Sequence, residues 1–323
     1  MSPRALITGG AGFIGSHVAD ALLDRGFQVV ILDDLSTGRL ANVPSGAELV
    51  QLDVRSPEAA ALVRQGGFDV VHHHAAQIDV RRSVADPVHD ASINILGALN
   101  LLEAVRAAPR PPRPLRFVFA STGGAIYGDF VTPPNAEDIA KDPESPYGIA
   151  KLAVEHYLAY YGRLHGIEGV VLRYANVYGP RQDPHGEAGV VAIFCNRILD
   201  GKPLTVFGDG RQTRDYVFVG DVAAANAAAA TAALPAVGRL DERAMNIGTA
   251  IETDVLTLAE TLRRVSGRKA SIEFAPARPG EQLRSSVRID KAQRVLGWKP
   301  ARALDEGLKE TFDYFAGLRE ARS

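Results

Sequence analysis

The chain has 323 residues, of which 46% are hydrophobic and 23% charged, and its formal net charge is −2. This balance is typical of globular proteins and excludes the strong positive field that attracts nucleic acids or anionic membranes. The single cysteine, Cys195, excludes an intrachain disulfide, and we expect it to be a buried helical residue. No apolar run reaches the length of a membrane span, and a strand begins almost at the first residue. These features predict a soluble cytoplasmic protein without a signal peptide.

The first predicted elements form a dinucleotide-binding unit. A buried strand over 4–8 leads into a loop with glycine at every third position, a helix over 16–23 and a second buried strand over 28–32. Such a loop lets a pyrophosphate approach the backbone, and the helix N-terminus adds N–H groups and a positive dipole end. An acid after the second strand can accept both hydroxyls of the adenosine ribose and would repel a 2′-phosphate, which predicts NAD rather than NADP. The cofactor site is assigned to Gly9, Gly12, Phe13, Ile14, Gly15, Asp33 and Asp34.

Strands and helices then alternate to about residue 175. Further strands are predicted over 48–52, 68–72, 115–120 and 170–174, with helices over 91–107 and 147–165 and a proline-rich connection over 109–114. Buried strands joined by helical crossovers predict an α/β fold with a Rossmann-type doubly wound parallel sheet.

Beyond Asn176 the regular alternation ends. Short strands such as 204–207 and loops rich in glycine and proline follow, but 244–248 again has the pattern of a sheet strand. We therefore expect an NAD-binding domain over 1–175, to which 215–250 returns. A smaller α/β substrate-binding region over 176–323 would be interleaved with it.

Four residues with useful chemistry converge near one edge of the predicted sheet. Ser121 and Thr122 follow the strand over 115–120, where ligands bind in such sheets. Tyr147 and Lys151 share a face at a helix start. An ammonium beside a phenol stabilises the phenolate, so we expect the pKa of Tyr147 to fall from about 10. Such a tyrosine can take a proton from a hydroxyl while hydride leaves the same carbon.

The glycine loop, His74-Ala75-Ala76 and Tyr147-x-x-x-Lys151 resemble the extended short-chain dehydrogenase/reductase family over essentially the whole chain. Segments 172–176, 206–210, 214–216 and 278–281 resemble its UDP-glucose 4-epimerase group. This resemblance implies further cofactor contacts from Asp53, Val54, His74, Ala75, Ala76, Asn94, Tyr147, Lys151 and Tyr174. It implies that the substrate is bound by Thr122, Asn176, Val191, Phe207, Arg214, Arg278, Glu281 and Ser285.

The resemblance also implies an activity. Tyr147, aided by Thr122, would take the 4-OH proton of a UDP-hexose, and NAD would oxidise C4 transiently before hydride returns to the opposite face. Two arginines can neutralise the diphosphate. Ser285, four positions after Glu281, would line the pocket beside the 2-substituent of the sugar. Its small size predicts that N-acetylated hexoses are accepted. A homodimer would form through the helices over 91–107 and 147–165.

Some positions depart from the family pattern and leave alternatives open. The usual catalytic hydroxyl position is Gly123, so Thr122 or Ser121 must supply the hydroxyl, and we favour Thr122. A cofactor-contacting lysine is replaced by Ile78. Residues 123–125 carry no carboxylate, which argues against nucleotide-sugar 4,6-dehydratases and UDP-glucuronate decarboxylases. Arg181 could meet a sugar carboxylate, so UDP-glucuronate 4-epimerisation stays open.

Two other interpretations are disfavoured. A non-catalytic NAD sensor would not need the tyrosine, the lysine and the strand-end hydroxyl together. A metal site at His72-His73-His74 is rejected, because neighbouring residues of a strand point to opposite faces.

Overall fold

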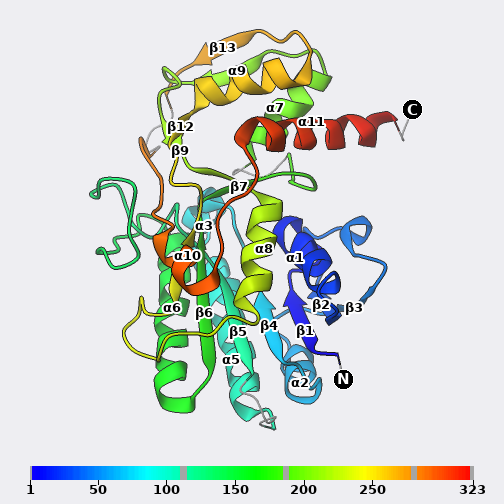
Figure 1. The fold of residues 1–323 in the computed structure, drawn as a ribbon, viewed down its shortest axis with the longest axis vertical. Coiled ribbons are helices and arrows are strands. Elements are labelled where there is room, and N and C mark those ends of the chain that lie inside the picture. Colours follow the sequence, from blue (N-terminus) through cyan, green and yellow to red (C-terminus); the bar gives the residue numbers. More distant parts are fainter. Residues whose placement is uncertain (1, 110–114, 185–188, 278–281, 321–323) are drawn as a thin grey trace.

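The computed structural model describes residues 2–109, 115–184, 189–277 and 282–320. Its largest element is a seven-stranded sheet with the order β11-β6-β5-β4-β1-β2-β3, in which every neighbouring pair is parallel (Figure 1). The predicted α/β fold with a doubly wound sheet is therefore confirmed. The strands are β1 (Arg4–Thr8), β2 (Gln28–Asp33), β3 (Ala47–Gln51), β4 (Val70–His73), β5 (Arg116–Thr122), β6 (Glu168–Tyr174) and β11 (Ala244–Ile247).

Helices cover both faces of this sheet. Successive side chains of a strand point to opposite faces, so neighbouring residues pack into different cores. Ile7 and its same-face neighbours pack against α1 (Phe13–Leu23), α8 (Val219–Ala229) and α10 (Asp290–Leu296). Leu6 and the residues of the opposite face pack against α2 (Pro57–Gln65), α5 (Ala98–Ala107) and α6 (Pro146–His165).

Local sequence fixes both ends of α6. The Ser145 side chain caps its N-terminus by accepting a hydrogen bond from the Gly148 N–H at 3.2 Å, and Pro146 occupies the first turn. Gly166 ends the helix in the left-handed conformation, with φ of 68°. Tyr147 therefore lies in the first turn of α6, and Lys151 lies one turn later.

The helix predicted over 91–107 is present, but its first part is π-helical instead of a regular α-helix. The chain forms α3 (Val80–Ala85), α4 (Pro87–Ala91), a π-helical segment (Ser92–Gly97) and only then α5. Inserting π-helical turns changes the direction of side chains relative to a regular helix. This irregular segment carries Asn94.

A second core lies beyond the carboxyl ends of the large sheet. There α7 (Val190–Leu199), α9 (Val255–Ser266) and α11 (Leu304–Glu320) pack together (Figure 1). Cys195 is buried in α7, as predicted. A short 3-10 helix (Leu40–Asn42) follows β2. Three two-stranded sheets complete the fold: β7 (Asn176–Tyr178) with β10 (Tyr216–Phe218), β8 (Leu204–Phe207) with β13 (Ile272–Ala275), and β9 (Thr213–Arg214) with β12 (Thr253–Asp254).

The chain passes back and forth between the two cores. After α7, β8 and β9 it returns to the large sheet, where β11 pairs with β6. The buried Asp215 carboxylate joins these passes by accepting hydrogen bonds from Thr249 N at 2.7 Å, Ala250 N at 3.0 Å and Val287 N at 3.3 Å. In the part of the chain that the structure describes, no helix is both long and apolar enough to cross a membrane.

Candidate active site

The glycine loop between β1 and α1 leaves no room for side chains. A methyl group built on Gly9, whose φ is +69°, would lie 2.6 Å from the Ala75 backbone nitrogen. One on Gly15 would lie 2.3 Å from the Gly9 carbonyl oxygen, and one on Gly12 would lie 3.1 Å from the same oxygen. Bare backbone at the start of α1 is what a pyrophosphate needs, so these residues fit NAD.

Asp33 ends β2 beside this loop. Its Oδ2 accepts a hydrogen bond from Ala11 N at 3.0 Å, and its Oδ1 accepts one from Leu35 N at 2.9 Å. Burial raises the pKa of this carboxyl, while the two amide bonds lower it. Each carboxylate oxygen can accept a second hydrogen bond, so the predicted ribose contacts remain available. The neighbouring Asp34 is turned toward Ser36 and is less buried.

The segment after β4 lies over the same loop. His72 and His74 stack on one face with ring centroids 6.2 Å apart, and His73 packs against Phe119 on the other face. His74 also stacks on Tyr174. Burial lowers the pKa of His72 to about 4 and that of His73 to about 3, so these rings are neutral near pH 7. The alternation of faces is as the sequence predicts.

Two of the predicted cofactor residues are engaged by the protein itself. Asp53 receives hydrogen bonds from Arg55, which lowers the pKa of the Asp53 carboxyl. The Asn94 amide accepts from Gln77 N at 3.0 Å and donates to the Gln77 carbonyl oxygen at 2.9 Å. Asn94 thus holds the segment after β4 in place, and its direct contact with the cofactor stays a prediction. Val54 is buried under the π-helical segment, against Gly97.

The two candidate hydroxyls point to different surroundings. Both lie inside β5, not beyond it, so they face opposite sides of the sheet. The Ser121 hydroxyl donates to Glu155 Oε1 at 2.5 Å and is buried. The Thr122 hydroxyl accepts a hydrogen bond from Gly124 N at 3.2 Å and is only partly buried. This arrangement favours Thr122 as the hydroxyl available to a substrate.

Tyr147 and Lys151 lie together at the start of α6. The Lys151 ammonium donates to the Ala120 carbonyl oxygen at 2.9 Å and lies 5.8 Å from the centre of the Tyr147 ring. Burial lowers the pKa of Lys151 to about 8, and Asp90 and Glu155 oppose this. The predicted fall in the pKa of Tyr147 is wrong for this environment. Burial raises that pKa because it desolvates the phenolate, and the negative charge of Asp90 raises it further.

Thr122 and Asn176 lie on either side of Gly124. A methyl group built on Gly124 would be 3.9 Å from Thr122 Oγ1 and 3.9 Å from Asn176 Oδ1. Arg214 donates to the backbone oxygens of Thr213 and Gln282, at 2.8 and 2.9 Å. Thr122 Oγ1 and Asn176 Oδ1 therefore border the same space beside Gly124.

The other predicted substrate residues are more dispersed. Val191 lies in α7 and is buried inside the second core, and Phe207 ends β8. Ser285 is buried on the segment that passes Gly123. Arg278 and Glu281 lie outside the described residues.

A model of the NAD dependent epimerase/dehydratase family matches residues 5–248. The chain belongs to this family. A putative UDP-glucose 4-epimerase of Methanocaldococcus jannaschii is 44% identical over 96% of this chain and 97% of that protein. The solved UDP-glucose 4-epimerase of Thermotoga maritima, with UDP-glucose, is 42% identical, with a TM-score of 0.90 over 98% of this chain and 99% of that chain.

A third relative bears on the cofactor. The solved UDP-glucose 4-epimerase of Thermus thermophilus, in complex with NAD, is 44% identical, with a TM-score of 0.87 over 97% of this chain and 99% of that chain. The predicted NAD cofactor, the predicted NAD-using enzyme and the predicted resemblance to UDP-glucose 4-epimerases are confirmed.

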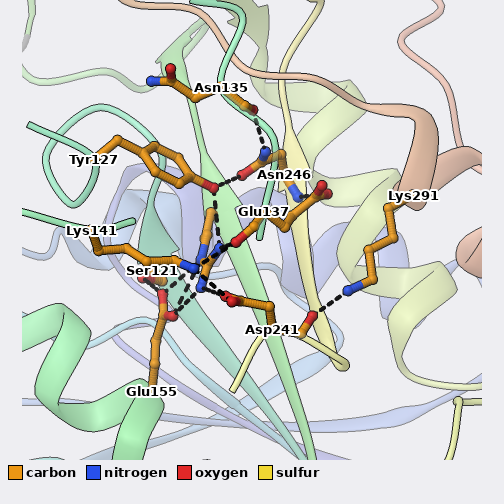
Figure 2. A network of polar contacts seen from close by, with 10 residues as sticks. Ser121, Tyr127, Asn135, Glu137, Lys141, Glu155, Asp241, Asn246 and Lys291 are labelled. Carbon is orange, nitrogen blue, oxygen red and sulfur yellow. Dashed lines mark hydrogen bonds and ion pairs between the residues drawn. The ribbon is translucent and has the colours of Figure 1, made fainter. Parts of the chain in front are cut away.

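The sequence did not predict the buried network of hydrogen bonds and ion pairs that lies beneath the site. Arg173 is fully buried and bonds to both oxygens of Glu155, with the closest contact 2.6 Å, and to Asp241 at 2.7 Å. Figure 2 shows Ser121, Glu155, Tyr127 and Asp241 converging in this network. The position of Glu155, four residues after Lys151 on one helix face, was the available signal.

Asp90 and Gln77 were also missed. Both are buried beside the segment that follows β4, and they are hydrogen-bonded to each other at 2.9 Å. Asp90 lies four residues before Asn94. The regular helix predicted over 91–107 gave no reason to expect Asp90 near Tyr147.

Proposed function

We propose that this enzyme is a UDP-sugar 4-epimerase acting on neutral hexoses, including the N-acetylated pair. The proposal rests on one observation. Tyr147, Lys151 and Thr122 lie at the edge of the large sheet that also carries the glycine loop, beside Gly124. Among the described residues, the atoms within 4 Å of a methyl group built on Gly124 are Thr122 Oγ1 and Asn176 Oδ1, and neither belongs to a carboxylate. The site can therefore move a proton, but residues 123–125 offer no acid or base for elimination or decarboxylation.

In the proposed mechanism, the proton and the hydride that leave the sugar are both returned to it. Tyr147 accepts the proton of the sugar 4-OH, and Lys151 stabilises the phenolate from the next turn of α6. Thr122 orients the hydroxyl. The glycine loop and Asp33 would hold NAD, which would accept the hydride from C4 and return it. When the 4-keto sugar has turned its other face, Tyr147 gives the proton back, so the product has the same formula as the substrate with C4 inverted.

The proposal favours neutral sugars over UDP-glucuronate. Arg181, the candidate partner for a sugar carboxylate, forms an ion pair with Asp20 of α1 at 2.7 Å. This pairing accounts for Arg181 without a substrate. Ser285 supports acceptance of the N-acetyl group, since a serine occupies less volume than an aromatic residue.

A substrate panel tests the proposed function. Purified protein, without added cofactor, should invert C4 of UDP-galactose and of UDP-N-acetylglucosamine, followed by NMR of the anomeric proton. Bound NAD is expected to be released on denaturation, because a cycle that regenerates its cofactor never needs exchange. Turnover of UDP-glucuronate alone would show that the assigned substrate class is wrong.

We further infer that two copies pair through α6. Large apolar side chains form an exposed stripe along this helix: Ile149, Tyr157, Tyr160 and Leu164. Outside α6, the exposed Leu96 and Val88 extend this stripe. Burying such a stripe is favourable. Leu164→Glu should convert a dimer to a monomer in light scattering, whereas Leu318→Glu on α11 should leave it dimeric. A monomeric parent protein would refute the pairing.

A further inference from the structure

Asp90 is a buried carboxylate that the proposed mechanism does not use. It is 1% exposed on α4. It accepts hydrogen bonds from Gln77 Nε2 at 2.9 Å and from Asn94 Nδ2 at 2.9 Å. Within the described ranges, no lysine, arginine or histidine side chain forms an ion pair with it. A buried charge without a cation is costly, so its retention calls for a reason.

Two side-chain amides present donors to the Asp90 carboxyl group. The Gln77 side-chain oxygen accepts from Asp79 N at 2.7 Å, and the Asn94 side-chain oxygen accepts from Gln77 N at 3.0 Å. These backbone contacts fix the orientation of both amides. Each therefore presents an N–H group to Asp90, and two donors to a carboxylate stabilise its charge.

The charge of Asp90 acts on the residues that open α6. Helix α4 packs against α6, and the Tyr147 N–H donates to Ser83 Oγ of α3 at 3.2 Å. After burial, Asp90 is the strongest influence on both residues of the pair: it raises the pKa of Tyr147 and that of Lys151.

Other groups near the pair do not replace this charge. Glu155, the other carboxylate that acts on Lys151, is bound by both its oxygens to Arg173 in the network of Figure 2. His73 and His74 are neutral, because burial lowers the pKa of His73 to about 3 and that of His74 well below 6.5. The remaining charged groups of α3 and α4 are exposed or half-buried side chains: Asp79, Arg81, Arg82, Asp86 and His89.

We propose that Asp90 is a positioning residue that balances the charge of Lys151 and keeps Tyr147 able to hold the proton taken from the substrate. The proposal rests on the function assigned above. With Asp90 ionised, Lys151 stays protonated in a buried site while Tyr147 remains a competent acid for the return step. Through Gln77 and Asn94, the same carboxylate also fixes the segment after β4.

Asp90→Asn tests this directly. Removing the negative charge should lower the titration midpoint of Lys151, which is about 8 in the parent protein, by on the order of one pH unit. The readout is NMR of lysine labelled at the ε carbon, with the signal assigned by its loss in Lys151→Arg. In the pH profile of kcat, the basic limb set by Lys151 should move to lower pH.

Matched variants separate charge from structure. Asp86 caps the N-terminus of the same helix by accepting from His89 N at 3.0 Å, and it is exposed. Asp86→Asn should weaken α4 without moving either titration, and Asp90→Glu should keep both near their parent values. If Asp90→Asn does not fold, the smaller Asp90→Ser removes the same charge.

An unchanged Lys151 midpoint in the folded charge-free variant would overturn the proposal, as would an equal shift in Asp86→Asn. The NMR titration needs no turnover. Failure of the whole UDP-sugar panel would therefore refute the assigned function on its own, whereas failure of the titration refutes the role of Asp90.

Discussion

Tyr147→Phe should lower kcat by about 10²–10⁴-fold, the usual contribution of a positioned acid–base group. The change removes one oxygen and keeps the ring that packs beside Lys151. NAD content after denaturation and UDP affinity by calorimetry should therefore stay near their parent values. Tyr157→Phe, an exposed position on the same helix, is the matched control and should retain full activity. A similar kcat loss in both variants would contradict a proton-transfer role for Tyr147.

The same assay separates the two hydroxyls of β5. Thr122→Ala should lower kcat because its hydroxyl is the one beside Gly124 and Asn176. Ser121→Ala should instead lower stability, because it removes one of the two donors to the buried Glu155 Oε1 and leaves only Arg173 Nε. A larger kcat loss in Ser121→Ala would reverse the assignment.

Ser285→Tyr should abolish turnover of the N-acetylated pair while UDP-galactose turnover survives. Ser285 is 3% exposed. It follows Arg284, which forms an isolated β-bridge with Thr213 of β9, and precedes Val287 by two residues. Val287 lies under Gly123, where an added methyl group would be 2.9 Å from its side chain. We expect a ring at position 285 to take up space in the proposed sugar pocket that an acetamide would need.

The informative quantity in this experiment is the ratio of kcat/KM for the two substrates, since a buried tyrosine can also lower stability. Ser285→Ala keeps the volume small and should leave the ratio unchanged. Equal losses on both substrates in Ser285→Tyr would mean that Ser285 does not control the width of the pocket.

The sequence predicted the fold well because its signals are local. Buried strands, a glycine loop and helix ends such as Ser145 and Gly166 are specified by neighbouring residues. The helix over 91–107 was predicted, but its π-helical segment was not, because such a segment leaves no periodic signal that distinguishes it from a regular helix. Strand β5 extended two residues further than predicted, and this places Ser121 and Thr122 on opposite faces.

The candidate site was only partly predictable, because its electrostatics depend on residues that are distant in sequence. The Tyr147-x-x-x-Lys151 spacing indicated the pair, but not the burial that raises the pKa of Tyr147. The influence of Asp90 depends on α4 packing against α6, a tertiary contact that no motif encodes. The Ser121 contact with Glu155 likewise requires the β5–α6 packing.

The return of the chain to its first sheet has a consequence for synthesis. When the ribosome has released the residues through β6, that strand is still an open edge, because β11 has not been made. Arg173 then has Glu155 but lacks Asp241, which follows 68 residues later. A nascent chain therefore holds an incomplete large sheet until β11 has been synthesised. A chain truncated between β6 and β11 would present a bare strand edge to other nascent chains.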